Sequence, residues 1–311
     1  MSDPLVTIGI STYNRAEGYL REALASALAQ TYEPLEIVIS DNASTDSTGE
    51  VVAEMADERV RYVRLDTNIG ANGNFNHCLE MAAGEYFLLL HDDDRIDGDL
   101  VEHSMAALAA SPHDGRPGLI RTGSRVIDAD GNVVSERPNR ARSDTLGNLM
   151  LSWFDHATSM YFCNTIYRTD LLRDTGGFHS PREQYIDVAA VIRVAARASV
   201  LDVPEVKASF RRHGGNTGTA QSIEAWCEDS VYLIDLMCEL APEHAEVLRA
   251  RGLRYFSRNN YNRVARFRGF ANRAQAYWRV YRWFGYRADP LSFIAYKRYA
   301  QFKRSRPGQS P

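Results

Sequence analysis

The fold of this chain is decided by the stretch Glu85-Tyr86-Phe87-Leu88-Leu89-Leu90-His91-Asp92-Asp93-Asp94, in which an apolar run ends abruptly in three acids. A short continuous apolar run of this kind is typical of a strand that is buried on both faces. Such strands occur in parallel sheets covered by helices, which bind their ligands at the carboxyl ends of the strands. The three acids therefore stand where this fold class predicts a binding site.

Working outward from this stretch, strands alternate with helices over the first 110 residues. The patterns predict strands at 5–10, 35–40, 60–65 and 85–90, and helices at 20–28, 47–55, 75–82 and 99–110. This order indicates an α/β fold with a mostly parallel sheet and helices on both faces. Polar residues follow each predicted strand, at Ser11–Asn14, Ser40–Asn42, Asp66–Asn68 and His91–Asp94.

The rest of the chain is less regular and then becomes helical. We expect a hairpin at 125–136, a strand at 160–167, a turn at 176–178, a helix at 185–198, and short strands at 200–203 and 206–212. Beyond these we expect helices at 223–240 and at about 245–284, the second broken near Gly252, and a last helix capped by Asp289-Pro290. The sequence thus predicts an α/β domain over residues 1–221 and a helical region over 222–311.

The net charge of -4 is the sum of two segments with opposite charge. Residues 1–250 hold 21 Lys and Arg against 39 Asp and Glu, whereas residues 251–311 hold 15 basic residues and one acid, Asp289. Four cysteines without a paired spacing indicate reduced thiols, and no signal-peptide or membrane-spanning pattern is found. We expect a cytoplasmic protein, either free or peripheral on the inner face of the membrane.

The acids Asp92, Asp93 and Asp94 indicate a divalent cation. Adjacent carboxylates repel one another unless a cation offsets their charge, and Mg²⁺ or Mn²⁺ is commonly held by one or two carboxylates together with substrate phosphates. The alternative is a solvated acidic loop. Asp41 has two readings as well: a carboxylate that binds a ribose or a base, or an Asx turn that begins the next helix.

Three stretches in the first hundred residues form a recognisable set. They are Val6-Thr7-Ile8-Gly9-Ile10-Ser11-Thr12-Tyr13-Asn14-Arg15, then Glu36-Ile37-Val38-Ile39-Ser40-Asp41-Asn42-Ala43-Ser44-Thr45-Asp46, and then Asn68-Ile69-Gly70 with Ala83-Gly84-Glu85-Tyr86 before the acids. Together they resemble the signatures of family 2 glycosyltransferases with the GT-A fold, and the resemblance extends from Leu5 to His213.

The resemblance implies transfer of a sugar from a nucleotide-sugar, with inversion at the anomeric carbon. Among family members uridine diphosphate is the most frequent nucleotide, and the acceptor is a glycan, a lipid-linked glycan or a small molecule. Carried over, the metal ligands are Asp94 or Asp92, with His213 on a loop beside them; the acids align in two registers. The nucleotide-sugar residues are Thr12, Tyr13, Asn14, Arg15, Asp41, Asn42, Asn68, Asp92 and Asp93.

The resemblance also implies a catalytic base, an Asp six residues before an Arg. Counting back from Arg193 gives Asp187, although Ile186 stands where the family usually has Glu. Glu183 is the second choice, and the structural alternative is that Asp187 only stabilises the start of a helix.

Two other functions remain open: a non-catalytic nucleotide-sugar-binding scaffold, and a sugar nucleotidyltransferase. The second would need a Gly-rich loop after the first strand, and residues 11–15 contain no glycine. The Q-x-x-R-W motif of processive synthases is also absent, because Arg279-Val280-Tyr281-Arg282-Trp283 lacks the Gln.

Residues 251–306 combine 15 basic with 15 aromatic residues. A helical stripe is predicted through Phe267, Phe270, Ala274, Trp278, Tyr281 and Phe284. It could lie on an anionic membrane, pack against the catalytic domain, or form a homo-oligomer. Nucleic acid is not expected as a partner, since no nucleic-acid-binding motif accompanies the charge.

Overall fold

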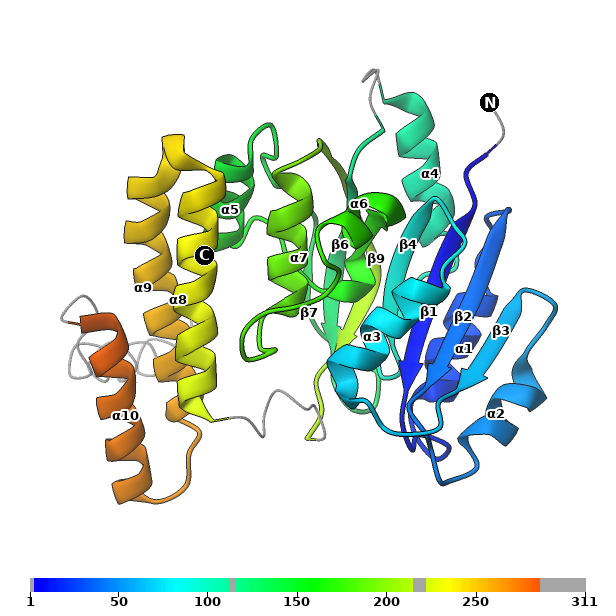
Figure 1. The fold of residues 1–311 in the computed structure, drawn as a ribbon, viewed down its shortest axis with the longest axis horizontal. Helices are drawn as coiled ribbons and strands as arrows, with labels where there is room; N and C mark the ends of the chain where they lie inside the picture. Colours follow the sequence, from blue (N-terminus) through cyan, green and yellow to red (C-terminus); the bar gives the residue numbers. More distant parts are fainter. Residues whose placement is uncertain (1–2, 112–115, 215–221, 286–311) are drawn as a thin grey trace, which may run out of the picture. The chain divides into compact units, whose positions relative to one another are not determined.

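The computed structural model describes residues 3–111, 116–214 and 222–285. The chain forms two compact units, residues 1–216 and residues 217–311. Figure 1 shows the sheet and its helices in the first unit, and a group of helices in the second.

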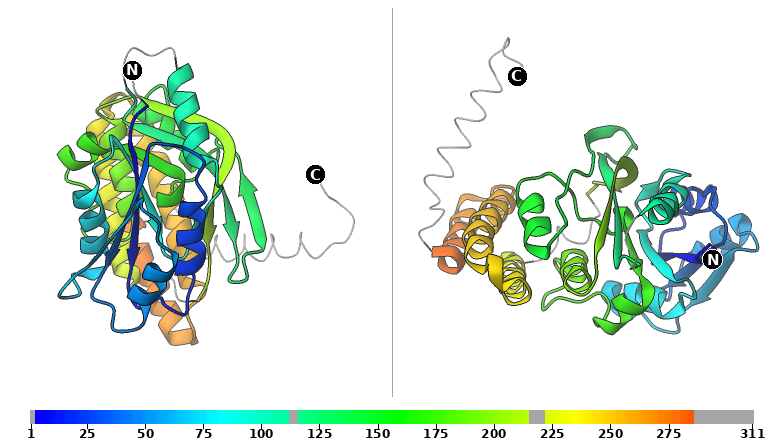
Figure 2. Two further views of the ribbon diagram at one scale, coloured as in Figure 1. Left: turned by 90° about the vertical axis from the view of Figure 1, so that its right-hand side faces the viewer. Right: turned by 90° about the horizontal axis from the view of Figure 1, so that it is seen from above.

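The first half of the first unit is a parallel sheet. Its strands are β1 (Val6–Thr12), β2 (Leu35–Asp41), β3 (Val60–Arg64) and β4 (Tyr86–His91), in the order β3-β2-β1-β4. The helices between and after them are α1 (Leu20–Leu28), α2 (Thr48–Met55), α3 (Gly70–Met81) and α4 (Leu100–Ala110). Every residue of β1 is buried, as a strand covered on both faces requires. Figure 2 shows helices on both sides of the sheet, which confirms the expected fold class.

The second half extends the sheet from β4 with strands in mixed orientation, both antiparallel and parallel. The order continues through β8 (Thr165–Arg168), β6 (Leu119–Ile127), β9 (Val200–Arg211) and β5 (Arg95–Ile96), and β7 (Val133–Arg137) pairs with β6 as the predicted hairpin. The helices of this half are α5 (Leu146–Phe154), η1 (Phe162–Asn164), α6 (Thr169–Asp174) and α7 (Ile186–Ala195). Strand β5 follows the three acids directly and pairs Arg95 with Ser209 of β9. The end of β9 is therefore held beside the acids.

Two strand predictions in this half need correction. The strand expected at 160–167 begins only at Thr165, because Asn164 Oδ1 accepts the Tyr161 amide and turns the preceding residues into a short 3₁₀ helix. The two short strands expected at 200–203 and 206–212 are one strand, β9. Its register against β6 shifts around Pro204, since a proline lacks the N–H that a regular ladder needs.

The second unit consists of α8 (Ile223–Leu240), a 3₁₀ turn (Pro242–His244), α9 (Ala245–Val264) and α10 (Phe270–Phe284). Helix α8 has the predicted bounds, and Ser222 Oγ caps it by accepting the Ala225 amide at 3.2 Å. The break predicted near Gly252 is wrong. Gly252 lies buried inside α9, where the packing of Leu248 and Phe256 offsets the roughly 1 kcal/mol that a helical glycine costs.

The break falls instead at 265–269, where Gly269 has a φ of 83°. The helix expected after Asp289-Pro290 lies outside the described residues. Within the described ranges, no helix combines the length and the apolar character that crossing a membrane requires.

Candidate functional site

The polar ends of three parallel strands meet at one edge of the sheet. In the sheet register, Thr12 of β1 lies beside Asp41 of β2, and Ser11 lies beside His91 of β4. The three acids follow His91 in a tight turn, in which the Asp94 amide donates to the His91 carbonyl at 3.1 Å. The strands thus bring together residues that are up to eighty positions apart in the sequence.

Asp92 faces the loop after β1. Its Oδ2 atom lies 3.6 Å from Nε of Arg15, and the Arg15 side chain is 31% exposed. Burial, together with the charge of Asp93, raises the pKa of Asp92 to about 7, although Arg15 acts in the opposite direction. Two residues predicted to bind the nucleotide-sugar are therefore neighbours, and a further positive charge would favour the ionised form of Asp92.

Asp93 is paired with His213. Its Oδ2 atom lies 2.9 Å from His213 Nε2, and the two side chains are only 12% and 9% exposed. The His213 ring lies 5.0 Å from the ring of Tyr19. The loop after β9, which was singled out from sequence for its histidine, thus reaches the acids, and it does so at Asp93.

Asp94 is the most deeply buried of the three acids, at 1% exposed. Its Oδ1 atom accepts the Arg211 amide at 2.8 Å. Burial and the neighbouring Asp93 raise the pKa of Asp94 well above its usual range. The Arg211 amide and the Cys163 side chain are thus both hydrogen-bonded to this carboxylate, which lies beside Asp93.

His91 completes a cluster with Asp93 and Asp94. Potential ligand atoms of these three residues all lie within 4.8 Å of one another. The His91 ring stacks on Phe75 at 4.7 Å, and its Nε2 atom is buried without a hydrogen-bond partner in the described part of the chain. Two neighbouring carboxylates, with the pKa of Asp94 raised, and an unpartnered buried ring nitrogen form a donor set that a divalent cation would satisfy.

Arg211 holds this acidic turn in place, and sequence reasoning missed it. The side chain is fully buried, with its guanidinium 4.1 Å above the ring of Tyr19. Its Nε donates to the Asp93 carbonyl at 2.8 Å, and its Nη2 donates to Glu22 at 2.6 Å. A buried charge with these partners fixes the backbone on both sides of the Asp93–His213 pair. An arginine at the end of a strand gives no sequence signal for this role.

We expect Arg211→Met to lower the melting temperature and to weaken catalysis. Loss of one member of a buried ionic network typically costs about 3–5 kcal/mol. Thermal unfolding and transfer assays on the same preparation measure both effects. Arg212→Met is the matched control, because Arg212 is the exposed neighbour. Equal melting temperatures for the two variants would contradict the bracing role of Arg211.

The loop after β2 is held mostly by its own hydrogen bonds. Asp41 is fully buried; its Oδ1 accepts the Ser44 amide at 2.8 Å, and its Oδ2 accepts the Tyr62 hydroxyl at 2.5 Å. Asn42 accepts the Ile69 amide and donates to Asn68 Oδ1 at 3.1 Å. The Asx-turn reading of Asp41 is thus present in the structure, and both its carboxylate oxygens have protein partners.

The loop after β1 is more open. Thr12 is 2% exposed, whereas Tyr13 is 45% exposed. Asn14 has a φ of 51°, and its side-chain oxygen accepts the Thr45 amide at 2.8 Å. Asn14 therefore connects the first two loops, while Tyr13 is exposed beside it and Arg15 is half-buried against Asp92.

Asp187 lies in the first turn of α7. Its Oδ1 atom accepts the Val188 amide at 2.8 Å, and burial raises its pKa to about 7. Its charge, in addition to burial, raises the pKa of Tyr167, so these two side chains are close. A carboxylate with a pKa near neutrality is suited to accept a proton at physiological pH. The alternative Glu183 is exposed, with a φ of 58° and a contact to Asn72 at 3.4 Å.

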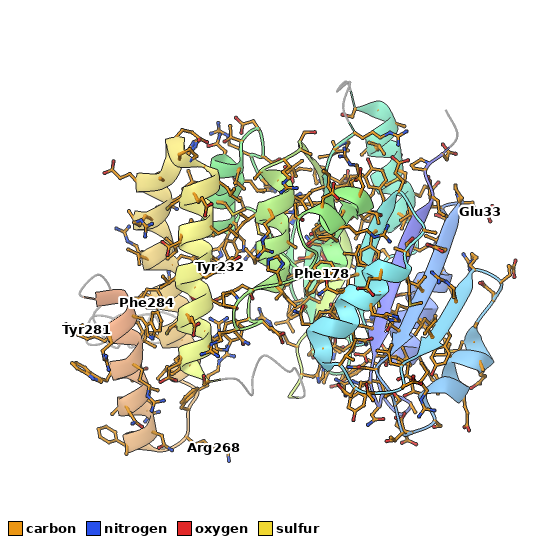
Figure 3. The ribbon with its side chains drawn as sticks, viewed as in Figure 1. Glu33, Phe178, Tyr232, Arg268, Tyr281 and Phe284 are labelled. Carbon is orange, nitrogen blue, oxygen red and sulfur yellow. The ribbon has the colours of Figure 1, made fainter. Side chains whose placement is uncertain are left out.

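The turn before α7 is fixed to α3. Gly176 and Gly177 both have positive φ, and a Cβ at Gly177 would collide with Asn76 Oδ1. That oxygen accepts the amide of Phe178 at 2.8 Å, and Figure 3 labels Phe178 in the interior. Arg193 donates to the His179 carbonyl at 3.0 Å. The Gly-Gly-Phe turn and the arginine of the base motif thus both hold the segment that precedes Asp187.

The chain is similar to known proteins of one family. The model of the family described as "Glycosyl transferase family 2" matches residues 7–176. Protein MT1568 of Mycobacterium tuberculosis is 29% identical over 234 residues, 70% of each chain. The GalNAc(5)-diNAcBac-PP-undecaprenol beta-1,3-glucosyltransferase of Campylobacter jejuni is 32% identical over 137 residues, 43% of this chain and 42% of that protein. Against a Rickettsia felis glycosyltransferase the match spans 21% of the relative's length.

Solved structures show the same fold. The crystal structure of S. aureus TarS 1-349 has a TM-score of 0.64 and 20% identity, and covers 87% of this chain and 80% of that one. The structure of the same TarS fragment in complex with UDP-GlcNAc has a TM-score of 0.60 and 18% sequence identity, and the match covers 84% of this chain and 83% of that one. The structure of mannosyltransferase PcManGT from Pyrobaculum calidifontis in complex with GDP-Man and Mn2+ has a TM-score of 0.55 and 18% sequence identity. The match covers 95% of this chain and 87% of that one.

Proposed function

Because this chain belongs to glycosyl transferase family 2 and is a glycosyltransferase, we propose that it transfers a sugar from a nucleoside-diphosphate sugar to an acceptor hydroxyl. The observation that carries the proposal is the continuous cluster at the strand ends, in which Arg15 lies beside Asp92 and His213 pairs with Asp93. Since the TarS fragment is seen with UDP-GlcNAc, we favour a UDP-sugar as the donor.

We propose an inverting reaction with Asp187 as the general base. Asp187 takes the proton of the acceptor hydroxyl while that oxygen attacks the anomeric carbon. The bond between the anomeric carbon and the diphosphate oxygen breaks on the opposite face, so the configuration inverts and the diphosphate leaves with the bonding electrons. The pKa of about 7 supports this role, because near neutral pH such a carboxylate can be ionised and still bind a proton strongly.

We propose Mg²⁺ or Mn²⁺ as the cofactor. Asp93, Asp94 and His91 would hold it, because their potential ligand atoms lie within 4.8 Å of one another. His213 is paired with Asp93, and Asp92 lies on the side of Arg15. The donor set fits, since it offers carboxylate oxygens and an imidazole in an anionic setting that a cation would neutralise. When bound, the metal would offset the charge of the leaving diphosphate. The residues of the chain would position the donor and accept the acceptor's proton.

For the acceptor we propose a glycan, and among glycans one linked to a lipid. The Campylobacter jejuni relative is named for an acceptor of this type, and it supports the proposal by similarity over 43% of this chain. A homo-oligomer remains a prediction from the sequence.

A thermal-shift screen of nucleotide-sugars with Mn²⁺ is expected to give the largest stabilisation with a UDP-sugar. A ligand at about 100 times its dissociation constant stabilises the folded state by about 2.7 kcal/mol. Donor hydrolysis with and without EDTA then separates an enzyme from a binding scaffold. Stabilisation without any turnover would contradict the transferase proposal, and no shift with any nucleotide-sugar would contradict the donor class.

A further inference from the structure

The turn between α9 and α10 exposes an unusual set of side chains. Residues 266–270 read Arg-Phe-Arg-Gly-Phe, and all five are exposed. Phe267 is 37% exposed and Phe270 is 83% exposed. Figure 3 labels Arg268 at this turn. Two exposed phenylalanines at the tip of a helical hairpin lack the hydrophobic stabilisation that burial would give them. Their exposure therefore indicates a surface that binds a partner.

Helix α10 has two different faces. Its buried side chains are Ala276, Val280 and Phe284, spaced by four residues. The predicted stripe lies mostly elsewhere. Its members Phe270, Ala274 and Trp278 are exposed, Trp278 by 60%, whereas Tyr281 is half-buried and Phe284 is buried. The buried face of α10 is therefore made by Ala276, Val280 and Phe284, whereas Phe270 and Trp278 lie on its exposed face.

The charged side chains of residues 251–285 are all basic. No Asp or Glu occurs between Arg251 and Gly285. On α10, Arg279 pairs with Glu224 of α8 at 2.7 Å. In the described ranges no ion pair involves the exposed Arg266, Arg268 or Arg282. These three arginines border the exposed aromatic residues and present uncompensated positive charge with them.

We propose that this surface docks on an anionic lipid bilayer. We call it the basic aromatic face and define it as Arg266, Phe267, Arg268, Phe270, Trp278 and Arg282. Phenylalanine at the tip can enter the boundary between headgroups and acyl chains, and tryptophan is favoured at the same depth. The arginines would bind lipid phosphates, because an anionic membrane surface attracts basic side chains.

Charge argues against the other occupants. A second copy of the same face carries the same positive charge and would repel it. Residues 286–311 of this chain hold six Lys and Arg against one acid, so they too are repelled. The other possible occupant is an acidic protein surface, including the acidic part of another copy of this chain. The experiment below distinguishes such a protein partner from a lipid bilayer. The proposal does not depend on the glycosyl-transfer mechanism, because it uses the second unit alone.

Co-sedimentation with vesicles tests the proposal on the full chain. One set of vesicles contains only phosphatidylcholine, and the other contains equal parts of phosphatidylcholine and phosphatidylglycerol. We expect the chain to sediment with the anionic vesicles and to remain in the supernatant with the neutral ones. Added salt should release it, because exposed charges are screened.

Two variants separate the apolar and the charged contributions. Phe267→Ala/Phe270→Ala removes the tip, and Arg266→Glu/Arg268→Glu reverses its charge. Each should lower the partition into anionic vesicles by at least about tenfold. The matched controls are Val133→Ala/Val134→Ala and Arg140→Glu/Arg142→Glu, which make similar changes at exposed positions of the first unit and should bind like the parent.

The remaining outcomes overturn the proposal. They are equal sedimentation with both vesicle types, no sedimentation with either, and parent-like binding by both tip variants. A fourth is the finding, by light scattering without lipid, that the parent is a dimer and the tip variants are monomers, while none of them binds vesicles. That result would assign the face to contact between copies. Circular dichroism of each variant checks that α9 and α10 remain folded.

Discussion

Asp187→Asn is expected to lower kcat for glycosyl transfer by about 10²- to 10⁴-fold, the usual contribution of a general base. The amide has nearly the same shape as the carboxylate, but it cannot accept the proton of the acceptor hydroxyl. Donor binding should not change, because Asp187 lies on α7 and the donor residues lie at the ends of β1, β2 and β4. Initial rates at saturating donor and the donor KM measure the two quantities separately.

Glu183→Gln is the matched control for this substitution. It makes the same chemical change four residues earlier, at the exposed position that is the second choice for the base. We expect it to retain parent activity. If Asp187→Asn retained activity and Glu183→Gln lost it, the base would be Glu183, and if both retained activity, neither carboxylate would be the base.

The pH dependence follows from the raised pKa of Asp187. Since the base acts in its ionised form, kcat/KM should rise with pH, pass through its midpoint near pH 7, and level off above it. This acidic limb should be absent from the residual activity of Asp187→Asn. A limb that persisted unchanged in the variant would report another group.

Stability should move in the opposite direction to activity. A carboxyl whose pKa is raised by folding binds more protons in the folded state than in the unfolded state between its usual pKa and about 7. Its contribution to stability therefore falls as the pH rises through that window. At pH 8 Asp187→Asn should melt no lower than the parent, so a loss of activity there would not come from unfolding.

Asp93→Asn is expected to have the second large effect, a loss of about 10²- to 10⁴-fold in metal-dependent transfer. A bound cation supplies several kcal/mol of charge stabilisation to a leaving diphosphate, and each 1.4 kcal/mol corresponds to a factor of ten in rate. Asp93 is the acid that contacts His213. Transfer rates across a Mn²⁺ titration should show a higher metal requirement in the variant.

Companion variants assign the individual acids. Asp130→Asn removes a carboxylate from the exposed hairpin turn and should have no effect. Asp94→Asn and Asp92→Asn test the two metal ligands inferred from the sequence. If either needed more Mn²⁺ while Asp93→Asn behaved like the parent, the ligand would be that acid and not Asp93.

The parallel half of the fold could be predicted because its signals are local. Three of its four strands are mainly apolar runs followed by polar residues, and the observed strand bounds lie within two residues of the predicted ones. The acids, Arg15 and His213 could be singled out for the same reason, since each stands beside a motif. The order of the strands in the second half of the sheet has no comparable local signal.

The pairing of Asp93 with His213 depends on contacts that no short pattern encodes. Strand β5 has two residues, too few for any periodicity, and its pairing with β9 sets the position of His213. On α10 the aromatic spacing predicted a stripe, but it did not reveal which face is buried. The buried face consists of Ala276, Val280 and Phe284, whereas Trp278 of the predicted stripe is exposed.

The pairing of β5 with β9 also determines when the site can form during synthesis. Asp93 and Arg211 are 118 residues apart in the sequence. At about 5–20 residues per second, the ribosome needs roughly 6–24 s to reach Arg211 after it has made Asp93. All four parallel strands are complete before that interval begins. The nascent chain therefore has its acids at the end of a finished strand while the arginine and histidine that organise them have still to be made.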